Sequence, residues 1–269
     1  VNHTRTIQVA FAFLSVGLTL KLALFPLHIW LPNAYTYAPS VVTAFIAATA
    51  TKVSVYVFLR FVFTIFGADF AFGTMHIDYL LLPLALAGIF VASAVAIYQS
   101  NLKRLLAYSS VAQIGYIMLG ISFGTITGLT AGIVHLFNHA LMKGALFLAV
   151  GSIFLRINSV QLDDLSGLGK RLPVTSFAFV LAGLGLIGVP LTVGFISKWY
   201  LLLAAIEAGW WPVAVLVLIS SLMALVYIWR FVETAYFRPV PDDAPPVSEA
   251  PLLMQIPMWL LIALAIGLG

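Results

Sequence analysis

The chain contains no cysteine and very little charge. The absence of cysteine from its 269 residues excludes disulfides, thiolate-held zinc and iron–sulfur clusters within this chain. Only 8% of the residues are Asp, Glu, Lys or Arg, whereas a soluble domain carries about a quarter. The chain is instead 62% hydrophobic, with a mean hydropathy of +1.10. This composition predicts an all-α, polytopic membrane protein, whose net charge of +4 bears on orientation and indicates no nucleic-acid partner.

Apolar windows of about 20 residues, the length that crosses a bilayer, predict about eight transmembrane helices. The windows fall at residues 7–27, 40–66, 78–98, 102–122, 126–155, 174–206, 211–236 and 252–269. Of the two longer connections, residues 156–173 carry charges of both signs, and residues 237–251 carry five prolines among acids. We expect the second connection to be an exposed linker. Because the chain opens on Val1 and stops inside its last window, we also expect a fragment of a longer protein.

Lys and Arg are distributed unevenly over the connections. If successive helices alternate in direction, the connections after the third, fifth and seventh windows share one side of the membrane. That side carries seven such residues and the opposite side two: Lys103, Arg104, Arg156, Lys170, Arg171, Arg230 and Arg238 against Arg5 and Arg60. Because positive connections favour the cytoplasm, we expect the amino terminus outside and a location in the plasma membrane, the inner membrane of a bacterium.

Two windows contain helix-breaking residues. Pro26 lies at the end of the first, and Gly188, Pro190 and Gly194 lie within the sixth, which is too long for a plain span. Proline removes a hydrogen-bond donor from the helix, and glycine permits unwinding. Irregular backbone at membrane depth is tolerated only against protein or a wet cavity, so paired breaks indicate a transport site. Two merely kinked structural helices are the alternative.

The spacing of the breaks predicts an internal repeat. They lie five helices apart, and because five is odd, a repeat of that length would be inverted across the membrane. We therefore expect residues 1–66 to be the end of a first repeat and residues 67–236 to be a complete second repeat of five helices. Residues 237–269 would then form a Pro-rich linker and the start of a further transmembrane helix.

Several ionisable side chains lie well inside the apolar windows: Lys21, Lys52, His135, His139, Lys143 and Lys198. The two histidines and Lys143 follow one another at four-residue intervals, which places them on one helix face with a rise of about 6 Å per step. Such groups are costly in a membrane and usually face a bundle interior or a water-filled path. A buried lysine releases its proton more readily than one in water, and a nearby carboxylate keeps it charged. Alternation between these states is what a proton pump requires, so we predict a proton relay.

Simpler interpretations exist for each of these groups. A single lysine can extend to the membrane surface or be held in an ion pair, and a single histidine can be a hydrogen-bonded core residue. The His-x-x-x-His spacing can bind zinc, but residue 136 is Leu where a metalloprotease has its Glu, and two imidazoles on one face cannot bracket a haem. We expect no metal and no cofactor.

All nine acids fall in connections or near helix ends, so we expect the counter-charge for the lysines to come from outside this chain. His28 is expected to border an entry to the proton relay.

Several motifs resemble the proton-conducting membrane transporter family. They are ALFPLHIWLPNA at residues 23–34, APS at 38–40, TKV at 51–53, NLKRLLAYSS at 101–110, the segment from His135 to Lys143, and GFISK at 194–198. This family comprises the antiporter-like subunits of respiratory complex I, of membrane-bound hydrogenases and of multisubunit (Mrp-type) cation/proton antiporters. Within it the resemblance is greatest to the D-type subunit of the monovalent cation/proton antiporters. It implies fourteen helices in two inverted five-helix repeats, of which this chain begins at the seventh.

The resemblance also implies roles for the buried cations. Lys21 resembles a lysine that pairs with a glutamate on the fifth helix, a helix that this chain lacks. Lys52 resembles the bridging lysine of the eighth helix, and Lys198 the terminal lysine of the twelfth, near the proton exit. His135, His139 and Lys143 resemble the central relay of the eleventh helix.

The function expected from these observations is transport without redox chemistry. Our first hypothesis is the proton-translocating subunit of a multisubunit monovalent cation (Na⁺)/H⁺ antiporter, working in the lipid bilayer with other membrane subunits. The alternative is an antiporter-like proton-pumping subunit of an NADH-quinone oxidoreductase (complex I) or of a membrane-bound hydrogenase. In either case the enzyme chemistry would lie in partner subunits. A third hypothesis, a scaffold, is disfavoured by the buried charges.

Overall fold

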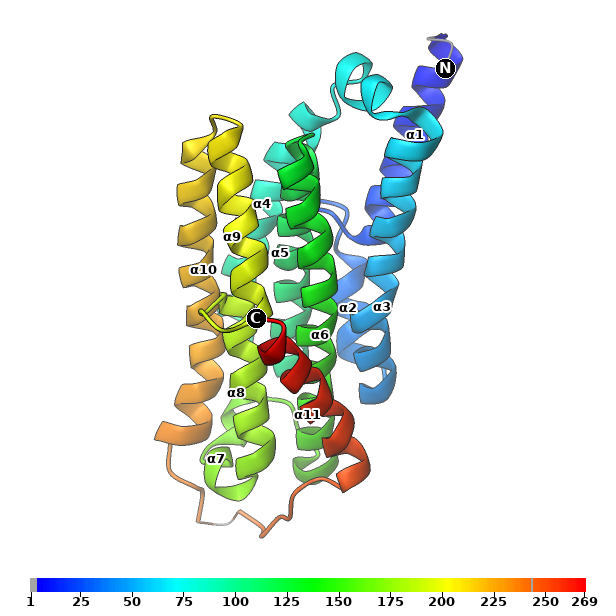
Figure 1. Cartoon of the computed structure of the whole chain (residues 1–269). Helices are drawn as coiled ribbons and strands as arrows, with labels where there is room; N and C mark the ends of the chain where they lie inside the picture. Colours follow the sequence, from blue (N-terminus) through cyan, green and yellow to red (C-terminus); the bar gives the residue numbers. More distant parts are fainter. Residues whose placement is uncertain (1–3, 243) are drawn as a thin grey trace.

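The computed structural model describes residues 4–242 and 244–269, which are almost entirely helical. The helices run in the order α1 (Arg5–Leu22), α2 (Trp30–Tyr37), α3 (Ser40–Leu59), η1 (Arg60–Phe66), η2 (Asp69–Thr74), α4 (Asp78–Ile97), α5 (Leu102–Ser122), α6 (Ile126–Ile157), η3 (Leu162–Leu165), α7 (Leu168–Arg171), α8 (Pro173–Ile187), α9 (Val193–Glu207), α10 (Trp211–Val232), η4 (Glu233–Phe237) and α11 (Leu252–Gly267). In Figure 1 the long helices run roughly side by side, and η2 projects at the end of the bundle where the amino terminus lies.

Six segments of the described chain are long and apolar enough to cross a bilayer. They are α1, α3 with η1, α4, α5, α6, and α10 with η4. The shorter apolar helix α11 and the consecutive pair α8 and α9 occupy the two remaining predicted windows. The prediction of an all-α polytopic membrane protein with about eight spans is therefore confirmed, with helix ends within a few residues of those expected.

Helix α5 forms the centre of the bundle. Its span is 94% buried inside the protein, whereas that of α1 is only 11% buried. Helix α5 packs against α4 on one side and α6 on the other, and α6 also contacts α3, α8, α9 and α11 (Figure 1). Close approach of α5 and α6 depends on glycine, since a Cβ added at Gly120 would lie 2.7 Å from the carbonyl oxygen of Gly128. A central helix that is surrounded by other helices can hold polar groups away from lipid.

The first predicted break is present. Helix α1 ends at Leu22, where the next residue, Ala23, adopts a left-handed backbone conformation, and helix α2 begins only at Trp30. Pro26 lies in the connecting turns. The first span is thus interrupted where the sequence predicted.

The second predicted break separates α8 from α9. Gly188 ends α8 with a positive φ of 87°, which glycine adopts without strain, and its N–H donates to the carbonyls of Leu184 and Gly185. Pro190 lies in the connection, and α9 begins at Val193. This break leaves the last carbonyls of α8 free to accept other donors.

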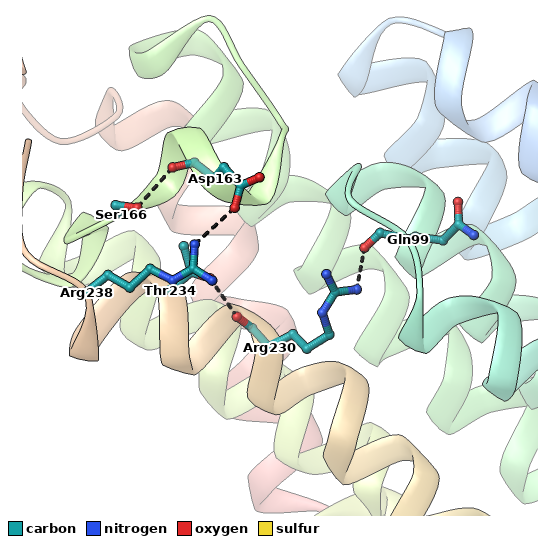
Figure 2. A network of polar contacts seen from close by, with 6 residues as sticks. All are labelled: Gln99, Asp163, Ser166, Arg230, Thr234 and Arg238. Carbon is teal, nitrogen blue, oxygen red and sulfur yellow. Dashed lines mark hydrogen bonds and ion pairs between the residues drawn. The ribbon is translucent and has the colours of Figure 1, made fainter.

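Arginine side chains tie the helices together at the end of the bundle that carries most of the cationic connections. Arg230 donates to the carbonyl oxygen of Ile97, at the end of α4, and to that of Gln99 at 2.6 Å. Figure 2 shows the contact with Gln99. Figure 2 also shows Arg238 paired with Asp163 at 3.0 Å, which joins the end of η4 to η3. The cations therefore complement a helix terminus and a surface acid, as expected at a membrane boundary.

The proline-rich linker is exposed over much of its length, as expected, and its described residues are also hydrogen-bonded to the bundle. The Glu249 carboxylate accepts hydrogen bonds from the backbone N–H of Val174 (2.7 Å) and the hydroxyl of Thr175 (2.6 Å), and so caps the start of α8. Arg156 donates to the Glu249 carbonyl at 2.6 Å, and Arg171 to that of Pro245 at 3.2 Å. Many linker side chains are exposed, but its backbone supplies acceptors and its acid supplies a cap.

Candidate functional site

Helix α6 carries three ionisable side chains on one buried face. His135, His139 and Lys143 each have an exposed fraction of 0%. The hydrogen-bond partners of His135 and Lys143 lie on α5 and α9, the helices that flank this face. The four-residue spacing thus directs all three groups into the protein interior, away from lipid, as predicted.

His135 is hydrogen-bonded through both ring nitrogens. Its Nε2 lies 2.9 Å from the Oε1 of Gln113 on α5, and its Nδ1 lies 2.8 Å from the Oγ of Ser197 on α9. The ring of Tyr116 contacts the imidazole edge-on, with the ring centres 5.4 Å apart. His135 therefore joins α5, α6 and α9 at one point.

His139 is surrounded differently. Its ring lies nearly parallel to that of His135, with the centres 6.4 Å apart and 11° between the planes. Within the described part of the chain neither ring nitrogen has a hydrogen-bond partner, although both are buried. A charged imidazole has two N–H donors, so this environment as it stands does not stabilise a charged His139.

Two lysines lie beside the histidines. Lys143 donates to the hydroxyl of Ser109 and, at 2.8 Å, to the carbonyl of Leu106, both on α5. Lys52 reaches in from α3, where it donates to the Ala47 carbonyl of its own helix. The charge of Lys52 is close enough to act on both histidines and on Lys143. The four groups thus form one electrostatically connected cluster.

Lys198 is bound at the second helix break. Its Nζ donates to the last carbonyls of α8, those of Leu186 (3.0 Å) and Ile187 (2.8 Å), and to the hydroxyl of Ser221 on α10 (2.9 Å). The negative end of a helix dipole favours a cation at this position. The Nζ also lies 4.9 Å from the ring centre of Tyr116, and the charge acts on His135. The broken helix therefore supplies the site of Lys198.

No carboxylate pairs with these lysines within the described residues. The one ion pair there joins Arg238 to Asp163, whose side chains are 43% and 84% exposed, so it is not part of the buried cluster. Carbonyl and hydroxyl oxygens are the acceptors that the buried ammonium groups use. Such acceptors bind an ammonium without neutralising it, so the cluster can both hold and release protons.

Lys21 and His28 lie apart from this cluster. Lys21 is exposed on the outer surface of α1. His28 is buried between α1 and α2, where its ring stacks on Phe25 with the centres 5.3 Å apart and lies 6.4 Å from the ring of Tyr108. Their roles at a helix break and at an entry remain predictions.

Uncharged polar residues of the site are absent from the sequence-based prediction. Three of them lie on one face of α5, at positions i, i+4 and i+7: Ser109, Gln113 and Tyr116. On α10, the hydroxyl of Ser220 hydrogen-bonds that of Tyr116 at 2.6 Å, and the buried hydroxyl of Tyr227 lies beside Gln113 and Ser109. Polar residues recurring at helical spacing within an apolar window are the signal that could have identified them.

Comparison with known proteins identifies the family. Residues 2–224 match the model of the NADH:quinone oxidoreductase/Mrp antiporter transmembrane family. The chain belongs to this family. The match covers the central helix α5, both broken spans and every residue of the predicted relay. The family-level resemblance inferred from the motifs is therefore confirmed.

Curated relatives of this family include subunits of two dehydrogenases. NADH-quinone oxidoreductase subunit N of Desulforudis audaxviator is 40% identical over 267 residues, which cover 97% of this chain and 53% of the relative. F(420)H(2) dehydrogenase subunit N of Methanosarcina mazei is 34% identical over 89% of this chain and 50% of the relative. The chain thus spans about half the length of the curated relatives it matches. These relatives are N-type subunits of dehydrogenases, and the finer assignment to the D-type antiporter subunit is not confirmed.

Solved structures of the family share the fold. The Mrp complex from Dietzia sp. DQ12-45-1b contains a chain with a TM-score of 0.90 and 27% identity, aligned over 99% of this chain and 57% of that one. A chain of respiratory complex I from Thermus thermophilus has a TM-score of 0.78 and 30% identity, over 97% and 56%. The helical arrangement is therefore common to antiporter and respiratory complexes and does not separate them.

Proposed function

We propose that this protein is an antiporter-like, proton-translocating membrane subunit of a respiratory complex of the NADH:quinone oxidoreductase type. The names of its curated relatives favour this function over the Na⁺/H⁺ antiporter that the motifs first suggested. The observation that carries the proposal is the buried cluster of Lys52, His135, His139, Lys143 and Lys198. Burying five ionisable groups together in a membrane is too costly for a purely structural core.

In the proposed mechanism protons move along a hydrated central axis between Lys52 on α3 and Lys198 on α9. Lys143 and His135 lie between them, each bonded to the polar face of α5. Hydroxyl groups along this path accept one proton as they release another. Charge on one lysine disfavours charge on its neighbours, so uptake at one end promotes release at the other.

The organisation and environment of the protein follow from the same proposal. Residues 1–66 would end one repeat, residues 67–236 would form the second, and residues 237–269 would continue into the carboxy-terminal helix. The cationic connections would face the cytoplasm and the amino terminus of the chain the outside. Partner subunits would carry out the electron transfer, and this chain would contribute proton transfer alone.

A second candidate function is cation/proton exchange. It is favoured by one observation, the TM-score of 0.90 to a chain of the Mrp complex. The two functions differ in what drives the protons. Proton movement that requires the electron donor and is indifferent to Na⁺ supports the respiratory function, whereas movement that requires a Na⁺ gradient and no donor supports exchange.

Substitution of the buried lysines tests the proposal. Lys52→Ala and Lys198→Ala should each abolish donor-driven proton translocation in inverted membrane vesicles, measured with a pH-sensitive dye, because each removes an end of the relay. Lys170→Ala, which alters an exposed lysine, is the matched control and should transport normally. Assembly of the complex, followed by native gel electrophoresis, should be unchanged in all three. Full transport by both buried-lysine variants would refute the relay.

A further inference from the structure

The two histidines of α6 differ in the hydrogen-bond partners of their ring nitrogens. Both ring nitrogens of His135 have partners, and neither nitrogen of His139 has one among the described residues. A histidine that carries a proton through a dry interior needs a partner for each nitrogen in both of its charge states. The arrangement around His135 meets this requirement through two residues, Gln113 and Ser197.

Gln113 determines which nitrogen of neutral His135 carries hydrogen. The atom of Gln113 that faces Nε2 is the amide oxygen Oε1, which accepts hydrogen bonds and has no proton to donate. With the amide of Gln113 in this orientation, Nε2 of His135 is the donor in the bond. The lone pair of the neutral ring is left on Nδ1, the nitrogen that faces Ser197.

Ser197 can serve Nδ1 in either charge state. Its Oγ lies 2.8 Å from Nδ1 of His135, 3.1 Å from the carbonyl oxygen of Gly194 and 3.4 Å from that of Val193. When His135 is neutral, the hydroxyl donates to Nδ1. When Nδ1 gains a proton, it donates to Oγ, and the hydroxyl hydrogen faces the Gly194 carbonyl. The proton that Nδ1 gains is the hydroxyl proton of Ser197, which Oγ replaces in the same step with the incoming proton of the relay, so no hydrogen bond of His135 is lost.

We propose that Gln113 and Ser197 are positioning residues that make Nδ1 of His135 the atom where the relay takes up and releases its proton. This inference rests on the proposed function and extends it to a single atom. It also places the rotating hydroxyl directly before Lys198 in α9, so protonation of His135 changes the hydrogen bonding of the backbone that carries the next member of the relay. His139 takes no part in this exchange in the conformation described.

The pH dependence of His135 is set by the groups around it. Lys52 from α3, His139 from its own helix and Lys198 from α9 act on it electrostatically or by ring contact, and Tyr116 lies against its edge. Tyr227 from α10 lies beside Gln113. Variants of Gln113 and Ser197 leave all of these groups in place, so a change in His135 caused by them reports the two hydrogen bonds.

Nitrogen NMR tests the position of the proton independently of transport. The protein with ¹⁵N-labelled histidine, in lipid bilayers, should show neutral His135 with hydrogen on Nε2, its signal being assigned by its loss in His135→Gln. In Gln113→Leu the acceptor is removed, and a mixture with the Nδ1–H form should appear. A wild-type ring with hydrogen on Nδ1, the form that a reversed Gln113 amide would impose, would overturn the proposal. This result stands whether or not the vesicles pump protons.

Transport measurements test the role of the hydroxyl. Ser197→Ala removes a hydrogen bond to a charged group and should lower the rate of proton translocation about tenfold and displace its pH profile. Ser197→Thr, which retains a hydroxyl, should keep most of the rate and the original profile. Ser152→Ala is the matched control, because Ser152 is a fully buried serine of α6 whose hydroxyl has no partner among the described residues. An unchanged profile in Ser197→Ala, or equal losses in the Ala and Thr variants, would refute the role.

Discussion

Substitution of Gly194 by alanine tests the idea that the contact between α8 and α9 positions Lys198. A Cβ added at Gly194 would lie 1.8 Å from the carbonyl oxygen of Gly185 and 2.8 Å from its carbonyl carbon. Carbon and oxygen atoms that are not bonded approach to about 3.3 Å, so the two half-helices must separate by about 1.5 Å. Overpacking of this kind costs about 1–3 kcal/mol of stability.

The separation acts directly on the relay. The Nζ of Lys198, on α9, is bonded to the carbonyls of Leu186 and Ile187, on α8, so moving one half-helix breaks these bonds or shifts the ammonium. A displacement of about 1 Å in a group that transfers protons can cost about a hundredfold in rate. We therefore expect Gly194→Ala to lower donor-driven proton translocation about a hundredfold and to lower the melting temperature of the purified protein.

Gly17→Ala provides the matched control. Gly17 lies within α1, where an added Cβ has no atom within 4 Å, and alanine favours a helix over glycine by about 1 kcal/mol. This variant should transport normally and melt no lower than the wild type. If Gly194→Ala matched it in both measurements, the contact between the half-helices would have no part in placing Lys198.

Two further predictions concern the linker and the segment between α1 and α2. Glu249→Ala leaves the first amides of α8 without their cap and should lower the free energy of unfolding by about 1 kcal/mol in thermal denaturation. Asp242→Ala, at an exposed acid of the same linker, should have no effect. Equal stability of the two variants would show that the cap contributes nothing. His28→Ala removes a ring packed on Phe25 but no member of the buried cluster, so its vesicle transport should fall by less than that of the buried-lysine variants. A complete loss would place His28 within the relay.

The spans and their breaks could be predicted because each has a local cause. A bilayer requires about 20 apolar residues wherever it is crossed, so composition alone marks the windows. Pro26 and Gly188 act on the backbone through their own covalent structure, so their effect does not depend on distant parts of the chain. The buried lysines and histidines were visible for a similar reason, since a charge inside an apolar window is conspicuous.

The uncharged half of the site could not be predicted in the same way. Serine and tyrosine are ordinary in membrane helices, and only the rotation of α5 against α6 and α10 decides that Ser109 and Gln113 face the histidines. The cap that Glu249 supplies to α8 joins residues 75 positions apart, and no local pattern encodes that contact. Lys21 lies in an apolar window as the buried lysines do, but within this chain it is exposed on α1, and its role at the helix break stays a prediction.

The distance along the chain between α8 and its cap has a consequence for biosynthesis. The amide of Val174 emerges from the ribosome 75 residues before the carboxylate that will accept its hydrogen. At about 5–20 residues per second, the first turn of this half-helix is left unfinished for about 4–15 s, while α9, α10 and the linker are still being made. The first turn of α8 is therefore capped only after the rest of the broken span, α10 and the linker have been synthesised.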